Sequence, residues 1–178
     1  VCDDDANLRR VLTRLFEHRG FEVRAAADGR EALESLAETG DPSRFRFPRP
    51  MLRGNQSSGD PDYLDFSFSG LKTAVAGVVE ELRSEGNLEA HRPDVAASFQ
   101  WAAVDVLSSK TMRAVKETGC TRVLLGGGVS ANRRLRQEIQ DRLGEDGRLF
   151  VASPRLSMDN GAMVAHAAAF RWKRGEVA

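Results

Sequence analysis

The feature that most constrains the fold is the stretch TRVLLGGGVSANRRLR at residues 121–136, where three glycines separate an apolar run from a charged segment. Val123, Leu124 and Leu125 form a continuous apolar run, as expected for a short buried strand. Ser130 is the expected N-cap of a following helix, because a serine hydroxyl can accept a hydrogen bond from an unpaired amide of the first turn. The stretch therefore predicts a strand, a glycine turn and a helix in succession.

The three glycines of this turn, Gly126, Gly127 and Gly128, have two interpretations. A strand–glycine–helix junction directs backbone N–H groups and a helix N-terminus at one place, which suits an anionic ligand. The same glycines would also serve a tight turn with close helix–strand packing, and such junctions occur in many α/β folds. Spacing alone leaves both interpretations open.

Hydrophobic periodicity predicts an alternation of helices and strands along the rest of the chain. Helices are expected over residues 6–19, 30–38, 70–83, 93–118, 130–143 and 162–172, and strands at 1–5, 21–25, 123–125 and 149–151. Asp5 and either Ser67 or Ser69 are expected N-caps. Pro93 is expected in the first turn of its helix, where a missing N–H loses no intrahelical bond. The alanines of the last helix would let it pack closely on a sheet. This order predicts an α/β fold.

The composition limits the classes of partner. The chain has 178 residues, 41% of them hydrophobic, and its 26 basic and 26 acidic residues give a formal net charge of zero. Any nucleic-acid contact must therefore come from a local patch. Cys2 and Cys120 are the only cysteines, which predicts a reducing, cytoplasmic setting without a disulfide framework. No apolar run reaches the roughly 18 residues that a membrane helix needs, so no membrane partner is expected.

One candidate for such a local patch lies in a segment rich in proline, glycine and serine at residues 40–62, which is expected to be a loop or linker. Arginines and phenylalanines alternate there: Arg44, Phe45, Arg46, Phe47, Arg49 and Arg53. Arginines with aromatic rings can engage phosphates and stacked bases of RNA. The alternative is a solvated edge with the two phenylalanines folded inward.

Asp159 is a second candidate site residue, because it lies where a loop leads into the alanine-rich helix. An aspartate at this place can be an N-cap, a metal ligand or both.

The N-terminal segments DDD, LRRVLTRLFEHRGFEV and DGREAL resemble the first forty or so residues of a response-regulator receiver domain. In that family two early acidic residues help to hold Mg²⁺ beside a phospho-accepting aspartate at the end of the third strand. Asp3, Asp4 and Asp5 take the acidic position, but the third strand and its aspartate do not follow. The segment therefore cannot be a working phosphorelay receiver, and the three carboxylates are better interpreted as a solvated helix start.

Five separated segments then occur in one order: FRFPRPM, DFSFSGLKTAV, DVAASFQ, LLGGGVSANRRLR and MDNGAMVA. Together they resemble the C-terminal half of the tRNA N6-adenosine threonylcarbamoyltransferase family, historically called O-sialoglycoprotein endopeptidase. The two resemblances together imply a receiver-like fragment at residues 1–37 and a C-terminal lobe of the transferase type at residues 38–178. It also implies an α/β lobe of the actin-like, sugar-kinase and Hsp70-type ATPase fold.

The resemblance further implies a reaction and a set of site residues. The reaction is transfer of the threonylcarbamoyl group from threonylcarbamoyl-AMP to N6 of adenosine 37 in tRNA, together with the other proteins of threonylcarbamoyladenosine synthesis. Gly126, Gly127 and Gly128 would lie against the adenylate, and Asn132 would hydrogen-bond the substrate. Asp159 would be one ligand of a divalent metal, iron or zinc. No catalytic residue is assigned.

The sequence departs from the family pattern at the metal site. The family's other two metal ligands form an HxxxH pair, whereas His18, His91 and His166 are the only histidines here and no two are four residues apart. Ser157-Met158 also stands where the family commonly has Cys-Thr. One aspartate is a poor metal site, since a zinc site uses at least three protein donors. We therefore expect an incomplete metal site. The alternative functions are a non-catalytic adenine-nucleotide-binding or assembly module and, through the receiver-like start, a phosphorelay receiver-type signalling protein.

Overall fold

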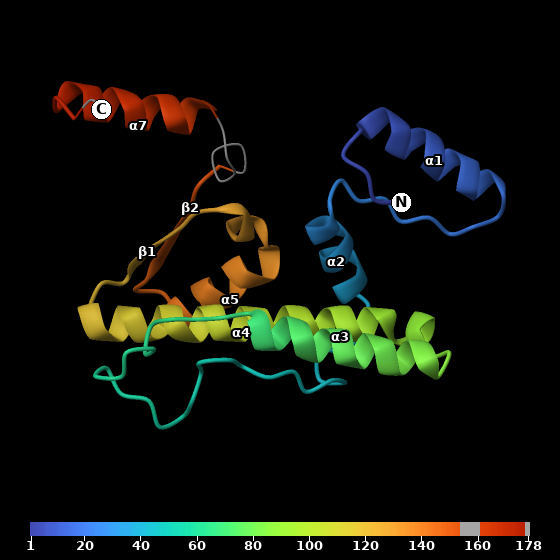
Figure 1. The fold of residues 1–178 in the computed structure, drawn as a ribbon, viewed down its shortest axis with the longest axis horizontal. Helices are drawn as coiled ribbons and strands as arrows, with labels where there is room; N and C mark the ends of the chain where they lie inside the picture. The colour runs from blue at the N-terminus through green and yellow to red at the C-terminus, as the bar shows by residue number, and fades with distance from the viewer. Residues whose placement is uncertain (154–160, 177–178) are drawn as a thin grey trace. The chain divides into compact units, whose positions relative to one another are not determined.

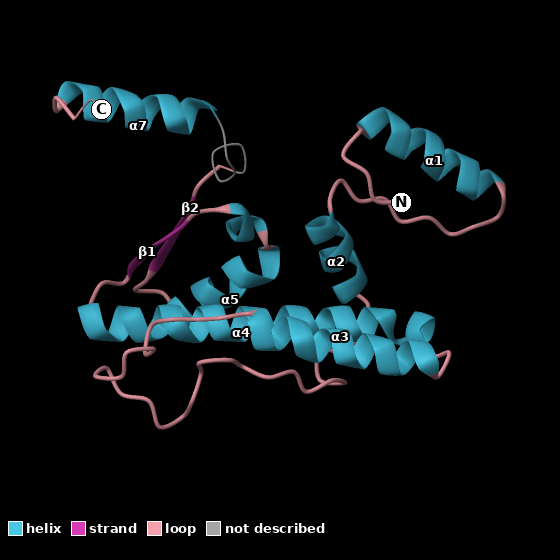
Figure 2. Ribbon diagram, in the orientation of Figure 1, coloured by secondary structure: helices cyan, strands magenta, loops and turns pink. Residues whose placement is uncertain are grey.

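The computed structural model describes residues 1–153 and 161–176, and Asp159 and Ser157-Met158 lie outside these residues. The chain forms two compact units, Val1–Arg113 and Ala114–Ala178. The boundary between them falls inside the long helix α4, Leu88–Thr118. Figure 1 shows the elements in chain order, and Figure 2 shows them by type.

Helix α4 is the longest element, and it differs from the prediction at its start. It ends at Thr118 before Gly119, whose φ of 66° suits a glycine, as predicted. It begins at Leu88 rather than Pro93, so that Pro93 lies inside the helix. A proline this close to the N-terminus removes only one intrahelical hydrogen bond, and Glu89 in the first turn interacts favourably with the helix dipole.

Helix α3, Ser69–Ser84, lies alongside α4 (Figures 1 and 2) and forms the main core with it. The buried members of this cluster come from both helices and from the preceding loop: Phe47, Leu71, Leu82, Val95 and Ala102. The prediction of a capping serine was wrong for Ser69, because Phe68 occupies the N-cap without a side-chain bond. Ser67 contributes a hydroxyl that accepts a hydrogen bond from the Ser69 amide at 3.3 Å.

The loop that precedes α3 is fixed along one face of α4. The Asp41 amide donates to Asp94 Oδ1 at 2.9 Å, and the Phe45 amide donates to Ser98 Oγ at 3.2 Å. Asp94 and Ser98 are four residues apart, a spacing that puts two side chains on the same helix face. Phe47 is 4% exposed in the core. The loop therefore folds its phenylalanines inward, as one of the two interpretations predicted.

The later part of this loop is held by two cations of α4. Lys110, which is 4% exposed, donates from Nζ to the carbonyl oxygens of Asp62 and Tyr63, each at 2.8 Å. Burial lowers the pKa of Lys110. Arg113 donates to the carbonyl oxygens of Arg53 at 3.0 Å and Tyr63 at 3.1 Å, and its guanidinium lies 4.8 Å from the centre of the Tyr63 ring. These contacts fix the backbone of the later part of the loop, although it has no helix or strand.

The N-terminal segment of this unit contains helices α1, Ala6–His18, and α2, Gly29–Ala37. Asp5 caps α1, as predicted, by accepting from the amides of Asn7 and Leu8. The predicted strands at 1–5 and 21–25 are wrong, because one parallel bridge between Cys2 and Ala26 is all that forms there. No residue of α1 is buried, and a two-residue pairing without a covered apolar face cannot sustain a sheet.

Helix α2 packs against α4 through small and branched apolar residues: Ala37 with Leu33 and Leu36 on one side, and Ala96 and Ala97 on the other. Gly40 follows at a close approach, since a Cβ on it would lie 2.0 Å from the Pro93 carbonyl oxygen. Residues 1–113 accordingly form one compact unit. The domain boundary at residue 37, which comes from the resemblance, stays a prediction.

The second unit contains a parallel two-stranded sheet. Strand β1, Arg122–Leu125, pairs with β2, Arg148–Val151, in a register that places Val123 beside Leu149. Helix α5, Arg133–Leu143, connects them and buries Leu135 and Ile139. The opposite face of the sheet is open, because Leu124 is 77% and Phe150 48% exposed. The predicted order of strand, helix and strand is confirmed, whereas the prediction of a fully buried strand was wrong.

Helix α7, Gly161–Lys173, forms within one residue of the predicted bounds. It does not pack on a sheet as predicted, since every residue of α7 is exposed in the part of the chain that the structure describes. Alanine side chains bury little apolar area, so an alanine-rich face gives only a weak driving force for docking. No helix among the described residues is long and apolar enough to cross a membrane.

Replacing Lys110 with methionine tests the anchoring of the loop. Lys110→Met keeps the apolar stem but leaves two carbonyl oxygens without their donor, so we expect the free energy of unfolding to fall by about 1–3 kcal/mol. Chemical denaturation measures this change. Lys116→Met, at an exposed position of the same helix, is the control and should have little effect. Equal stability of the two variants would contradict the anchoring role.

The start of the loop should respond to acid. The pKa of Asp94 is lowered from 3.8, first because its carboxylate accepts from the Asp41 amide and also because it pairs with His91. A folded pKa below the unfolded one adds stability that is fully present above pH 3.8 and is lost as pH falls through the folded pKa. Asp94→Asn, which keeps an acceptor but not the charge, should be less stable than wild type at pH 6. The difference should shrink at pH 3, and a constant difference in urea denaturation would contradict the assignment.

Candidate functional site

The glycine turn after β1 has one position that only glycine can occupy. Gly127 has φ 79° and ψ 172°, a backbone conformation that is essentially limited to glycine. A short 3₁₀ turn, η1, Gly128–Ala131, follows it and is closed by the Ser130 amide donating to the Gly127 carbonyl at 3.0 Å. The tight-turn interpretation therefore accounts for Gly127.

The other two glycines are not required by packing within the described residues. A Cβ placed on Gly126 or Gly128 would meet no atom within 4 Å, and neither residue has a positive φ. The space beside the turn is thus open to a ligand, as the anion-site interpretation requires.

Asn132, rather than the predicted Ser130, is the N-cap of α5. Its side-chain Oδ1 accepts from the Leu135 amide at 2.8 Å. The prediction failed because residues 128–131 take a 3₁₀ turn, which delays the α-helix to Arg133. Ser130 is instead completely buried, and its Oγ has no hydrogen-bond partner among the described residues. Asn132 therefore has a structural role as well as the one implied by the resemblance.

The described residues do not supply a metal site. No group of three or more His, Cys, Asp or Glu side chains converges within residues 1–153 and 161–176. His91 Nδ1 lies 3.3 Å from Asp94 Oδ2, while His18 and His166 are exposed. Asp159 falls outside the described residues, so its contribution stays a prediction.

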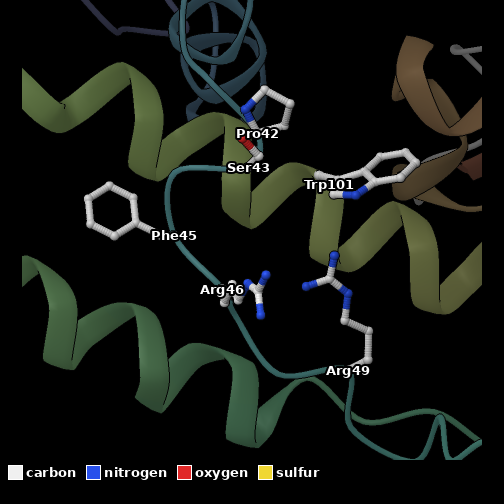
Figure 3. Close-up of a pocket in the computed structure, with 6 residues that line it drawn as sticks. All are labelled: Pro42, Ser43, Phe45, Arg46, Arg49 and Trp101. Carbon is white, nitrogen blue, oxygen red and sulfur yellow. The ribbon is translucent and has the colours of Figure 1, made fainter.

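A second candidate site lies in the first unit, between the loop and α4 (Figure 3). A surface pocket of about 230 Å³ is lined by residues of both segments: Pro42, Ser43, Phe45, Arg46, Arg49 and Trp101. Arg49 is held in place, with Nε 3.2 Å from Asp105 Oδ2 and Nη1 donating to the Phe47 carbonyl at 2.6 Å. Arg46 is exposed and makes no hydrogen bond or ion pair with the described residues.

Sequence reasoning named the arginines of this pocket but missed Trp101. The spacing places Trp101 on the same face of α4 as two polar residues, because it lies three residues after Ser98 and four before Asp105. These three positions share one helix face, and the two polar residues on it contact the loop. A tryptophan on a face that binds a basic loop was therefore recognisable only once the loop was known to lie there.

A parallel strand–helix–strand unit with a glycine turn after its first strand belongs to the α/β class, in which ligands commonly bind beyond the carboxyl ends of strands. Residues 13–166 match the family model described as TsaD: tRNA N6-adenosine threonylcarbamoyltransferase. The chain belongs to this family. The match begins within residues 1–37, and the comparisons give no support to the receiver-like resemblance of that segment.

Two curated relatives illustrate the similarity. A tRNA N6-adenosine threonylcarbamoyltransferase of Gemmatimonas aurantiaca is 42% identical over 155 residues, which cover 84% of this chain and 43% of the relative. One of Bordetella petrii is 49% identical over 149 residues, which cover 83% of this chain and 41% of the relative. The chain thus spans about two fifths of the length of these relatives.

Alanine substitutions at two neighbouring glycines separate the turn from the open surface. Gly127→Ala forces a side chain into a conformation reserved for glycine, and we expect it to lower the free energy of unfolding by about 1–3 kcal/mol. Gly126→Ala is the matched control, because its Cβ would meet no atom and its φ is not positive. Thermal and denaturant unfolding measure both variants. A Gly127→Ala protein as stable as Gly126→Ala would show that the turn has a different conformation.

Proposed function

We propose that this chain serves transfer of the threonylcarbamoyl group from threonylcarbamoyl-AMP to N6 of adenosine 37 in tRNA, as the C-terminal part of such a transferase. The family match over residues 13–166, which contains the glycine turn and Asn132, carries this proposal. The parallel β1–α5–β2 unit supports a lobe of the actin-like ATPase type. Partner proteins of threonylcarbamoyladenosine synthesis follow from the same reaction.

The proposed substrate surface is the glycine turn. Gly126 and Gly128 leave open space in which the adenylate can approach the backbone closely, which is the usual use of glycine beside a phosphate-bearing ligand. Asn132, the N-cap residue of α5, would contact the substrate. Its capping bond to the Leu135 amide fixes the direction of the side chain, so the contact would come from a preorganised group.

The metal assignment rests on the resemblance alone. Asp159 would be one ligand of a divalent iron or zinc ion, and the remaining ligands would not come from the described residues of this chain. A bound metal would act as Lewis acid and orienting template for the acyl adenylate. The residues described here bind and orient the adenylate in this scheme.

A test of the substrate surface must preserve the cap. Asn132→Ala removes both the cap and the proposed contact, and the loss of the cap alone costs about 1 kcal/mol. Asn132→Asp keeps an equally good capping oxygen while replacing the amide with a carboxylate, which repels an anionic ligand. We therefore expect Asn132→Asp to fold with nearly unchanged stability and to bind a non-hydrolysable threonylcarbamoyl-adenylate analogue at least tenfold more weakly in calorimetry.

The matched control is Asn87→Asp, which makes the same change of side chain and charge at an exposed position. It should bind the analogue as wild type does. Equal affinities of wild type, Asn87→Asp and Asn132→Asp would contradict the role of Asn132. Absence of analogue binding by wild type would contradict the substrate surface as a whole.

A further inference from the structure

We propose that the pocket between the loop and α4 binds one nucleotide of a single-stranded RNA segment, with the base against Trp101 and a phosphodiester between Arg46 and Arg49. This inference deepens the proposed function, since it names a contact surface for the RNA substrate, and it rests on that function for the identity of the RNA. The pocket lies wholly within the first unit, and the glycine turn lies in the second.

The charge of the pocket fits a phosphodiester. Figure 3 shows the guanidinium groups of Arg46 and Arg49 pointing toward one another. Arg49 is paired with Asp105 at 3.2 Å, whereas Arg46 has no such partner among the described residues. Arg46, Arg49 and Asp105 together carry one net positive charge, which matches the single negative charge of a phosphodiester. Guanidinium groups also present several donors in a fixed plane, which suits phosphate oxygens.

The aromatic wall of the pocket is Trp101, and it comes from the helix side. Trp101 is half-buried on α4, so part of its indole is exposed to the pocket. Phe45 is directed elsewhere, because its ring packs with Phe47 at 6.3 Å and with His91 at 6.1 Å between ring centres. Trp101 is therefore the surface on which a base would stack. Base–aromatic stacking contributes about 1–3 kcal/mol per base.

The pocket is preorganised by contacts that hold the loop backbone and the Arg49 side chain in place. Ser98 Oγ accepts from the Phe45 amide and donates to the Asp41 carbonyl, each at 3.2 Å. The Arg49 guanidinium is fixed by Asp105 and by the Phe47 carbonyl. A binding group that is already ordered loses less conformational entropy when the ligand arrives. The loop can thus act as a fixed binding surface although it has no regular secondary structure.

The size of the pocket favours one nucleotide of a chain over a free small molecule. Pockets that enclose a small ligand usually have volumes of about 300–1,000 Å³, and this one has about 230 Å³. A nucleotide within a strand needs only partial enclosure, because its neighbours add further contacts. A free nucleoside monophosphate presents the same base and phosphate but lacks those contacts, and it should bind much more weakly.

Tryptophan fluorescence provides a direct test. The chain has two tryptophans, so Trp172→Phe leaves Trp101 as the single reporter. We expect a single-stranded seven-nucleotide RNA to quench its fluorescence, and Arg46→Ala in this background to weaken binding about tenfold, as loss of a charge-assisted hydrogen bond predicts. Loss of one phosphate contact should also reduce the slope of log K against log salt concentration by about 0.7.

Two further variants separate the pocket from general charge effects. Arg44→Ala removes the same charge from an exposed arginine that does not line the pocket, and it should bind RNA as the parent does. Trp101→Leu should weaken binding on the order of tenfold in anisotropy measurements with labelled RNA, whereas Trp101→Phe should retain most of it. Circular dichroism establishes that each variant is folded.

The outcomes are distinct. Quenching by RNA with selective loss in Arg46→Ala supports the proposal. Equal losses of affinity in Arg44→Ala and Arg46→Ala would show that binding depends only on non-specific charge, and would overturn the proposal. An affinity for AMP equal to that for RNA would also overturn it. So would a higher affinity for a polyglutamate peptide than for RNA. Failure of the acyl-adenylate analogue to bind, with RNA binding intact, would overturn the glycine-turn assignment and leave this pocket standing.

Discussion

The first unit depends on polar side chains of α4 that hold the loop preceding α3. Asp94, Ser98 and Asp105 contact the beginning of the loop, and Lys110 and Arg113 contact its end. The segment of about thirty residues between α2 and α3 has no helix or strand, and it would otherwise lose much conformational entropy for few contacts. Hydrogen bonds to side chains of a rigid helix replace the sheet or helix bonds that this backbone lacks. The same contacts close one side of the core, because they hold Phe47 over α3 and α4.

Periodicity and glycine positions were sufficient to predict most elements of the fold. The apolar run at Val123–Leu125 and the helix ends at Thr118 and Leu143 depend on local rules. The residues that follow these two helix ends are glycines with positive φ, Gly119 and Gly144. The prediction of strands at 1–5 and 21–25 was wrong because a strand depends on features that are not local. A strand needs a neighbour and a covered face, and an alternating pattern carries no information about whether these exist. The open face of β1 at Leu124 shows the same limit.

The candidate site shows where prediction from residue type reaches its limit. Ser130 and Asn132 are both good capping residues, and the sequence gives no reason to prefer the later one. The choice is made by the backbone, because Gly127 starts a 3₁₀ turn that uses the amides of Ser130 and Asn132 before the α-helix begins. Asn132 thereby gains a second function. A substitution that weakens ligand binding at such a position is informative only when the cap is kept.

The arginine-rich loop shows how two interpretations of one pattern can each hold for different residues. Phe45 and Phe47 turn toward the core, as a solvated edge would require. The arginines divide in a different way: Arg53 pairs with Asp62 and Arg49 with Asp105, while Arg46 keeps its charge available at the pocket. Of several arginines close together in the sequence, only those without a carboxylate partner keep their charge for a ligand. The neighbouring carboxylates determine which arginines these are, and they come from residues up to fifty-six positions away.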